Sequence, residues 1–246
     1  MTIEIIDEPF TGGRPIRGLS GADAADLLAL FNRNCRDDKP PRCLQYGYLP
    51  IFKRPDWTLA LIPQQASEAG AIFMDSEIDD VDKGLLAFYG VSLDFARAHW
   101  PPVSPVEPFW RMLRDDGVEE VAIMPWNRQA KEVFLGAPHD DAVAYIEDML
   151  PPRRAANLEC AVFDTSGHWA LYTCIEDISV LAGEPAIMDA YAERAGGWGW
   201  VKAMFAIKHQ IGMRLRHEFA ELYEYAGWVW PFDEGGRPAP PPAADP

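Results

Sequence analysis

The strongest constraint on the fold is a pair of β-rich runs separated by a short polar turn. Residues 158–163 and 168–173 are rich in branched and aromatic side chains, and the turn between them, Asp-Thr-Ser-Gly, ends in Gly167. Two such runs around a turn that ends in glycine are typical of an antiparallel hairpin. The sequence therefore predicts a hairpin over residues 158–173.

Other segments show strand or helix patterns. Strand composition predicts strands at residues 3–6, 57–62, 71–74, 118–124 and 133–135. Apolar spacing and terminating residues predict helices at residues 20–34, 109–113, 140–150 and 183–194. A further helical stretch is predicted from the acidic run at residues 75–82 to about residue 100. The chain is therefore expected to belong to the α+β class, with a mixed or mainly antiparallel sheet packed against several helices.

The C-terminal part predicts a long amphipathic helix over residues 198–226, because apolar side chains recur there at helical spacing. This stripe consists of Val201, Met204, Ile211, Leu215, Phe219, Leu222 and Ala226. Beyond it, residues 235–246 contain five prolines in twelve positions, which predicts a disordered tail. We expect one globular domain over residues 1–234.

The charge balance limits the classes of partner. The chain has 22 basic and 38 acidic side chains, a formal net charge of −16. Such a field repels nucleic acids and anionic membranes and attracts basic proteins, although high charge also serves solubility alone. The N-terminus has no basic segment of the signal-peptide type, and no apolar run approaches the ~20 residues of a membrane helix. A cytoplasmic protein that binds neither nucleic acid nor membrane is expected.

The four cysteines give no support for a metal or redox site. Cys35, Cys43, Cys160 and Cys174 form no Cys-x-x-Cys pair, so we expect buried, reduced thiols and no structural metal. Cys160 and Cys174 flank the predicted hairpin, and whether they touch is left open. No nucleotide-binding loop occurs in its required context, so no cofactor is expected.

Acidic residues cluster between positions 75 and 82. The carboxylates are Asp75, Glu77, Asp79, Asp80 and Asp82. Their spacing resembles a calcium loop, but the sixth position lacks the required glycine and the twelfth lacks glutamate, which excludes an EF-hand. A weaker cation site, a solvated loop and a patch that faces a partner remain as interpretations. A second cluster contains Asp115, Asp116, Glu119 and Glu120.

Two tryptophans, Trp198 and Trp200, alternate with glycines and are predicted either to cover the core or to form an exposed contact. A hydrolase site assembled from Asp164, His168 and Glu176 is the alternative enzymatic hypothesis. The turn at Asp164 lacks the Asp-Thr-Gly or Asp-Ser-Gly triplet of aspartic proteases, so a turn residue is the favoured interpretation.

The segment over residues 158–190 resembles a pattern in uncharacterised bacterial proteins, some of which look like immunity proteins of toxin systems. The resemblance is carried by Gly167-His168-Trp169, by Glu176-Asp177 and by the Leu-Ala-Gly that ends at Gly183. It implies a binding protein. Together with the acidity, it gives the hypothesis of an immunity or inhibitor protein for a basic partner such as a toxin. The acidic run, Trp198 and Trp200 would form its contact surface.

Overall fold

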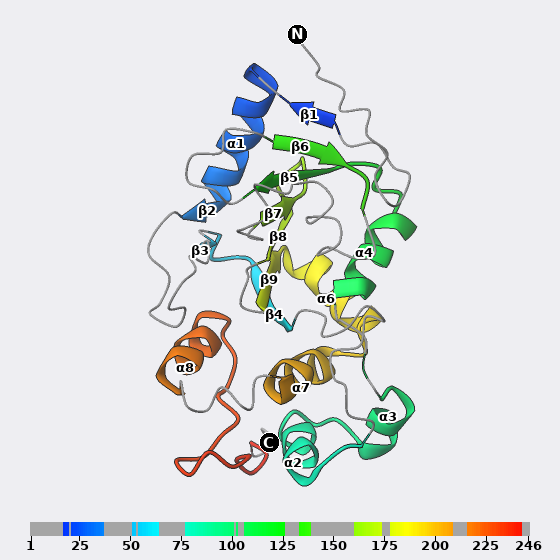
Figure 1. Cartoon of the computed structure of the whole chain (residues 1–246), viewed down its shortest axis with the longest axis vertical. Helices are drawn as coiled ribbons and strands as arrows, with labels where there is room; N and C mark the ends of the chain where they lie inside the picture. The colour runs from blue at the N-terminus through cyan, green and yellow to red at the C-terminus, as the bar shows by residue number, and fades with distance from the viewer. Residues whose placement is uncertain are drawn as a thin grey trace, which may run out of the picture.

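The computed structural model describes residues 17–19, 21–36, 51–52, 54–63, 77–100, 102, 106–125, 133–138, 160–173, 178–208 and 216–242. It contains a seven-stranded sheet in the order β1-β6-β5-β7-β8-β9-β4, in which every pair is antiparallel (Figure 1). Its strands are β1 (Arg17–Leu19), β4 (Thr58–Pro63), β5 (Val121–Pro125), β6 (Val133–Gly136), β7 (Cys160–Phe163), β8 (Trp169–Thr173) and β9 (Ile178–Gly183). A separate pair joins β2 (Cys35–Arg36) and β3 (Ile51–Phe52).

Helices pack around this sheet, so the predicted α+β class with a mainly antiparallel sheet is confirmed. The described helices are α1 (Ala22–Asn34), α2 (Asp80–Phe88), α3 (Leu93–Ala98), α4 (Val106–Asp115), α6 (Pro185–Arg194), α7 (Trp198–Lys208) and α8 (Arg216–Tyr225). None of them is long and apolar enough to cross a membrane. The predicted strands at 3–6 and 71–74 and the predicted helix at 140–150 lie outside the described residues.

The predicted hairpin is confirmed as the β7–β8 pair, in which Phe163 faces Ala170 across the ladder. Its turn is closed by Asp164, whose carboxylate accepts hydrogen bonds from the backbone N–H groups of Ser166 and His168, each at 3.1 Å. Gly167 adopts a φ of 84°, a conformation that favours glycine. The buried Asn34 donates to the Gly167 carbonyl at 3.2 Å and thereby attaches the end of α1 to the turn.

Helices cover both faces of the sheet. Phe163 contacts Phe31 of α1, with ring centroids 5.1 Å apart, whereas Trp169 contacts Phe109 of α4 at 4.8 Å. Because Phe163 pairs with Ala170 and side chains alternate along a strand, the neighbouring Trp169 points to the opposite face. Helix α1 therefore lies on one face, and α4 with its neighbour α6 lies on the other.

A second layer extends beyond the edge strand β4. Helix α7 packs against β4, and α2 packs against α7 on the side away from the sheet (Figure 1). The apolar side chains between these helices form their own buried cluster, which includes Leu85, Trp200, Met204 and Phe232. This layer positions the candidate site described below.

The single long helix predicted over residues 198–226 is not confirmed. Helices α7 and α8 are separate elements, and residues 209–215 between them lie outside the described part. Helix α7 is also not amphipathic in the predicted way, because residues 200, 201 and 203–207 are all buried. The sheet and α2 enclose this helix from different sides, so it has no broad solvent face.

Two further boundaries differ from the predictions. The helical stretch toward Trp100 consists of two helices, because Gly90, at a φ of 72°, redirects the chain after α2. The tail was predicted to be disordered from residue 235, yet residues 235–242 are held against the domain. The Ala239 amide donates to the Pro231 carbonyl at 2.8 Å, and Phe232 pairs with Pro238 in an antiparallel bridge.

Candidate functional site

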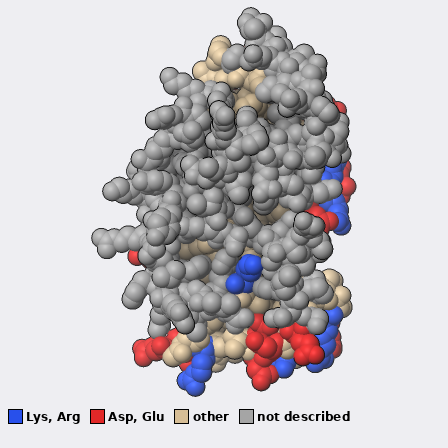
Figure 2. All heavy atoms as spheres, viewed as in Figure 1, with Lys and Arg blue, Asp and Glu red and all other residues tan. Residues whose placement is uncertain are grey.

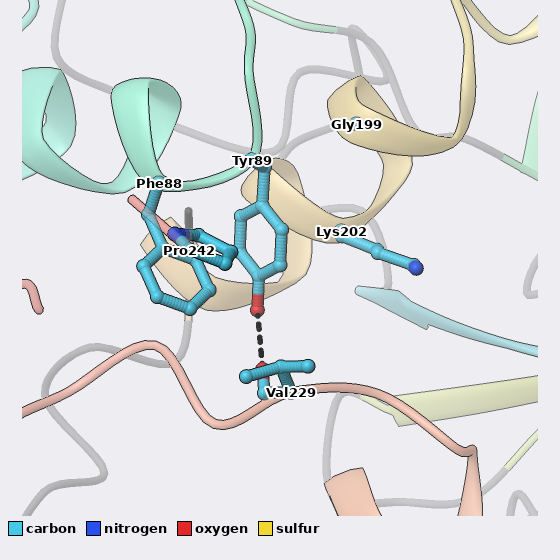
Figure 3. Close-up of a pocket in the computed structure, with 6 residues that line it drawn as sticks. All are labelled: Phe88, Tyr89, Gly199, Lys202, Val229 and Pro242. Atoms are coloured by element: carbon cyan, nitrogen blue, oxygen red, sulfur yellow. Dashed lines mark hydrogen bonds between the residues drawn. The ribbon is translucent and has the colours of Figure 1, made fainter. Parts of the chain in front are cut away.

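A cavity of about 250 Å³ lies where α2 ends against the first turns of α7. Figure 3 shows the described residues that line it, which are Phe88, Tyr89, Gly199, Lys202, Val229 and Pro242. In this view Phe88 and Pro242 stand at one side, the Lys202 side chain extends at the other, and the Tyr89 ring lies between them. The cavity therefore has an apolar side, and the Lys202 side chain lines the other side with its amine pointing away from Phe88 and Pro242 in this view.

The end of α2 determines one wall. Tyr89 is the C-terminal cap residue of this helix, and its amide still donates to the Leu85 carbonyl at 3.2 Å. Gly90 then reverses the direction, and the Val91 amide donates back to the Leu86 carbonyl at 2.8 Å. This closed helix end fixes the position of the Tyr89 ring.

Helix α7 approaches this wall unusually closely, and Gly199 makes the approach possible. A Cβ atom at Gly199 would lie 2.5 Å from the Tyr89 backbone oxygen, well inside any normal contact. Only glycine lets the first turn of α7 come this near to another backbone. The side chain of Lys202, one turn further on, is consequently placed beside the end of α2.

The Tyr89 hydroxyl is held by hydrogen bonds rather than left available for acid–base chemistry. It donates to the Val229 carbonyl at 3.2 Å and hydrogen-bonds to the buried Tyr223. Burial raises the pKa of Tyr89 above its usual range, and burial likewise raises the pKa of Tyr223. Both phenols are therefore neutral over the physiological pH range, and they connect α2, α8 and the segment around Val229.

Lys202 is the charged group of the cavity. Its side chain is half-buried, and its Nζ atom lies 5.7 Å from the ring centroid of Trp228, within cation–π range. Burial lowers the pKa of Lys202, because an ammonium loses hydration there. Among the residues that the structure describes, no carboxylate pairs with this ammonium.

The structure assigns local roles to most of the acidic run. Asp79 caps α2 by accepting from the Asp82 amide at 2.7 Å, and the Asp82 carboxylate accepts from the Asp79 amide at 3.1 Å. Asp82 is only 5% exposed, so its interpretation as a partner-facing residue is wrong: it belongs to a capping box. Asp80 is exposed and pairs with Lys83, and Glu77 is exposed. Asp75 lies outside the described residues.

The two tryptophans occupy different environments. Trp200 is 6% exposed and packs edge-on against Phe95, with ring centroids 5.3 Å apart, so it is a core residue and not a contact surface. Trp198 is half-buried, and its indole N–H donates to the Asp189 carboxylate at 3.0 Å. Only Trp198 retains a partly exposed ring.

The second acidic cluster is partly neutralised. Arg194 of α6 lies 3.0 Å from Asp115 and 3.4 Å from Asp116, which attaches α6 to the end of α4. Such exposed pairs contribute little stability, about 0–1 kcal/mol each. Their main effect is to cancel part of the negative charge that the sequence concentrates at this position.

The residues of the hydrolase hypothesis are only partly brought together. The imidazole of His168 lies 3.2 Å from the Asp164 carboxylate, but this carboxylate already closes the hairpin turn, and the His168 side chain is half-exposed. Glu176 lies outside the described residues, as does Cys174 and the side chain of Cys160. Throughout the part of the chain that is described, no three His, Cys, Asp or Glu side chains gather in a way that could hold a metal ion.

Sequence reasoning did not identify Lys202 or Tyr89. A signal for Lys202 is present, since it is the one charged residue within an otherwise apolar run from residue 200 to 207. Phe88 and Tyr89 precede the other lining residues by more than 100 positions in the chain, so only the fold brings them together. Comparisons of this chain with protein-family models, with curated proteins and with solved structures found no match.

Proposed function

We propose that this chain is a binding protein that recognises a basic protein partner through the layer formed by α2, α3 and the segment after α8. One observation carries the proposal: the exposed large apolar residues of the described part all belong to this layer. They are Val81 in α2, Leu93 in α3 and Val229 after α8, with exposed fractions of 36%, 36% and 62%. Apolar side chains left in water in one region are typical of an interaction surface.

Acidic side chains share this end of the molecule. Glu77, Asp79 and Asp80 lie at the start of α2, and Asp94 lies in the first turn of α3. Figure 2 shows acidic side chains gathered at this end with a few basic ones among them. A surface with exposed apolar side chains among carboxylates supports an electropositive partner, because charge speeds encounter and apolar contacts slow dissociation.

An immunity or inhibitor protein that covers a basic toxin surface is one class of protein with this property, and we propose that class here. The hydrolase alternative gains no support from the described geometry. Asp164 and His168 are explained by the turn that they close.

The proposal is tested by capturing partners from the source cell and measuring their association kinetics. A Glu77→Gln/Asp80→Asn variant should lower the association rate about threefold or more, a part of the ten- to thousandfold that steering supplies. The matched control, Glu119→Gln/Glu193→Gln, removes the same charge outside this layer and should have a smaller effect. A Val229→Ser variant should instead raise the dissociation rate.

Two results would contradict the proposal. One is an association rate that stays constant between roughly 50 and 500 mM salt, where the screening length falls from about 14 to about 4 Å. The other is an equal effect of the two double variants, which would show that total charge matters and this layer does not. Turnover of a small substrate by the isolated chain would exclude a purely binding function.

A further inference from the structure

We propose that the cavity between α2 and α7 binds a small organic monocarboxylate, whose carboxylate pairs with Lys202 and whose apolar body contacts Phe88, Val229 and Pro242. This site differs from the protein-binding surface proposed above, because its occupant is a small molecule. Val229 belongs to both sites. The two proposals are therefore separated by variants at Lys202 and at Glu77 with Asp80, which are not shared.

The charge of the ligand follows from Lys202. In a chain with a formal net charge of −16, most exposed cations of the described part have carboxylate partners, as Lys83, Arg97, Arg111 and Arg194 do. Lys202 is half-buried and has no carboxylate partner among the described residues, and burial opposes its charged form. A carboxylate that enters the cavity would compensate this lost hydration with a charge-assisted hydrogen bond. Its binding should therefore raise the pKa of Lys202.

The cavity favours a single negative charge. Lys202 is the one cation among the lining residues that the structure describes, so a second anionic group would have no counter-charge from them. A phosphate ester, which carries between one and two charges near neutral pH, is thus disfavoured relative to a monocarboxylate.

The apolar side and the volume determine the rest of the ligand. Phe88 is buried at the cavity wall, and Val229 and Pro242 are exposed and lie where the cavity meets solvent. About 250 Å³ is below the roughly 300–1,000 Å³ of pockets that take drug-sized molecules. The ligand is therefore an aromatic or short aliphatic acid, of which phenylacetate is a suitable probe.

The walls are fixed before any ligand arrives. The Tyr89 hydroxyl is anchored to the Val229 carbonyl, and Gly199 lets α7 lie directly on the Tyr89 backbone. A site that needs little ordering loses less free energy on binding. A small acid can therefore bind measurably despite its few contacts.

The experiment uses the full chain with its six lysines labelled with ¹³C at Cε, titrated with phenylacetate and with neutral phenylacetamide. The Lys202 resonance should titrate at lower pH than those of the other lysines, and phenylacetate should move its midpoint upward. Phenylacetamide should bind at least tenfold more weakly, since it lacks the charge. The variant Lys202→Met should lose at least tenfold in phenylacetate affinity, whereas Lys208→Met on the same helix should bind as the unmodified chain does.

Three results would overturn this proposal. The first is no chemical-shift change at roughly 10 mM phenylacetate, a concentration that detects even millimolar affinity. The second is equal affinity for the acid and the amide, a comparison that depends on no variant and so on no change in folding. The third is unchanged phenylacetate binding by Lys202→Met.

Discussion

The contact between α7 and the end of α2 can be tested with a single methyl group at Gly199. In a helix the change Gly→Ala ordinarily stabilises by about 1 kcal/mol. At Gly199, however, the new Cβ would lie 2.5 Å from the Tyr89 carbonyl oxygen, so the two backbones must separate. Overpacking of this kind costs about 1–3 kcal/mol, and separation also loosens the cluster around Trp200 and Met204. We expect Gly199→Ala to lower the free energy of unfolding by about 1–2 kcal/mol in urea titrations.

The matched control is Gly84→Ala in α2, which gains the same helix propensity. Its Cβ would lie 2.7 Å from Pro238, a side chain of the C-terminal segment, and not from helix backbone. Pro238 can move with its short segment, so the clash should offset only part of the gain in helix propensity, and Gly84→Ala should raise the free energy of unfolding by up to about 1 kcal/mol. Hydrogen exchange at the Ala239 amide should accelerate as that segment shifts. If Gly199→Ala were as stable as the unmodified chain, α7 would not lie against Tyr89, and the described cavity would be wrong.

Three further predictions concern the Tyr191 hydroxyl, the Lys202 ammonium and the Asp79 cap. The Tyr191 hydroxyl is fully buried and has no hydrogen-bond partner in the described part, so Tyr191→Phe should stabilise the protein by about 1 kcal/mol; a loss in thermal denaturation would contradict this. Between the lowered pKa of Lys202 and its ordinary 10.5, the unfolded chain binds more protons than the folded one, so stability from this residue rises with pH. Lys202→Met removes this half-buried charge and should be more stable than the unmodified chain at pH 7. This difference in the free energy of unfolding should shrink toward pH 10, and a constant difference would refute the lowered pKa of Lys202. Asp79→Ala should remove the α2 cap and cost about 1 kcal/mol in urea unfolding, whereas an unchanged midpoint would deny the capping role.

Local chemistry was sufficient to predict the hairpin but not the order of strands. The turn at residues 164–167 depends on neighbouring residues, so the sequence specifies it directly. Strands β4 and β9 pair over their full lengths although they are more than 100 residues apart. Strand β9 is buried at all six positions, so it lacks the alternation that marks a half-exposed strand. The pairing of β9 with β4 is therefore determined by tertiary packing and is not marked in the residue pattern of β9 itself.

The helix prediction over 198–226 failed for a related reason. Its apolar stripe assumed one solvent-facing side, but α7 lies between β4 and α2 and buries apolar residues around its circumference. The same burial of α7 explains why the sequence alone did not identify Lys202 as a candidate site residue. A lysine in a buried helix is unusual only once its surroundings are known, and these come from α2 and from Val229 and Pro242.

The structure also changes what the charge of the acidic run means for binding. Asp79 and Asp82 use their carboxylates on backbone amides at the start of α2, where the helix dipole also favours negative charge. Replacing the buried Asp82 therefore tests folding, and a loss of partner binding in that variant would carry no information about contact. Asp80 and Glu77 are exposed and leave the cap intact when neutralised. Within the described part of the acidic run, variants at Asp80 and Glu77 are therefore the ones that test charge steering without removing the helix cap. Neutralising the whole run at once would change partner association and helix stability together.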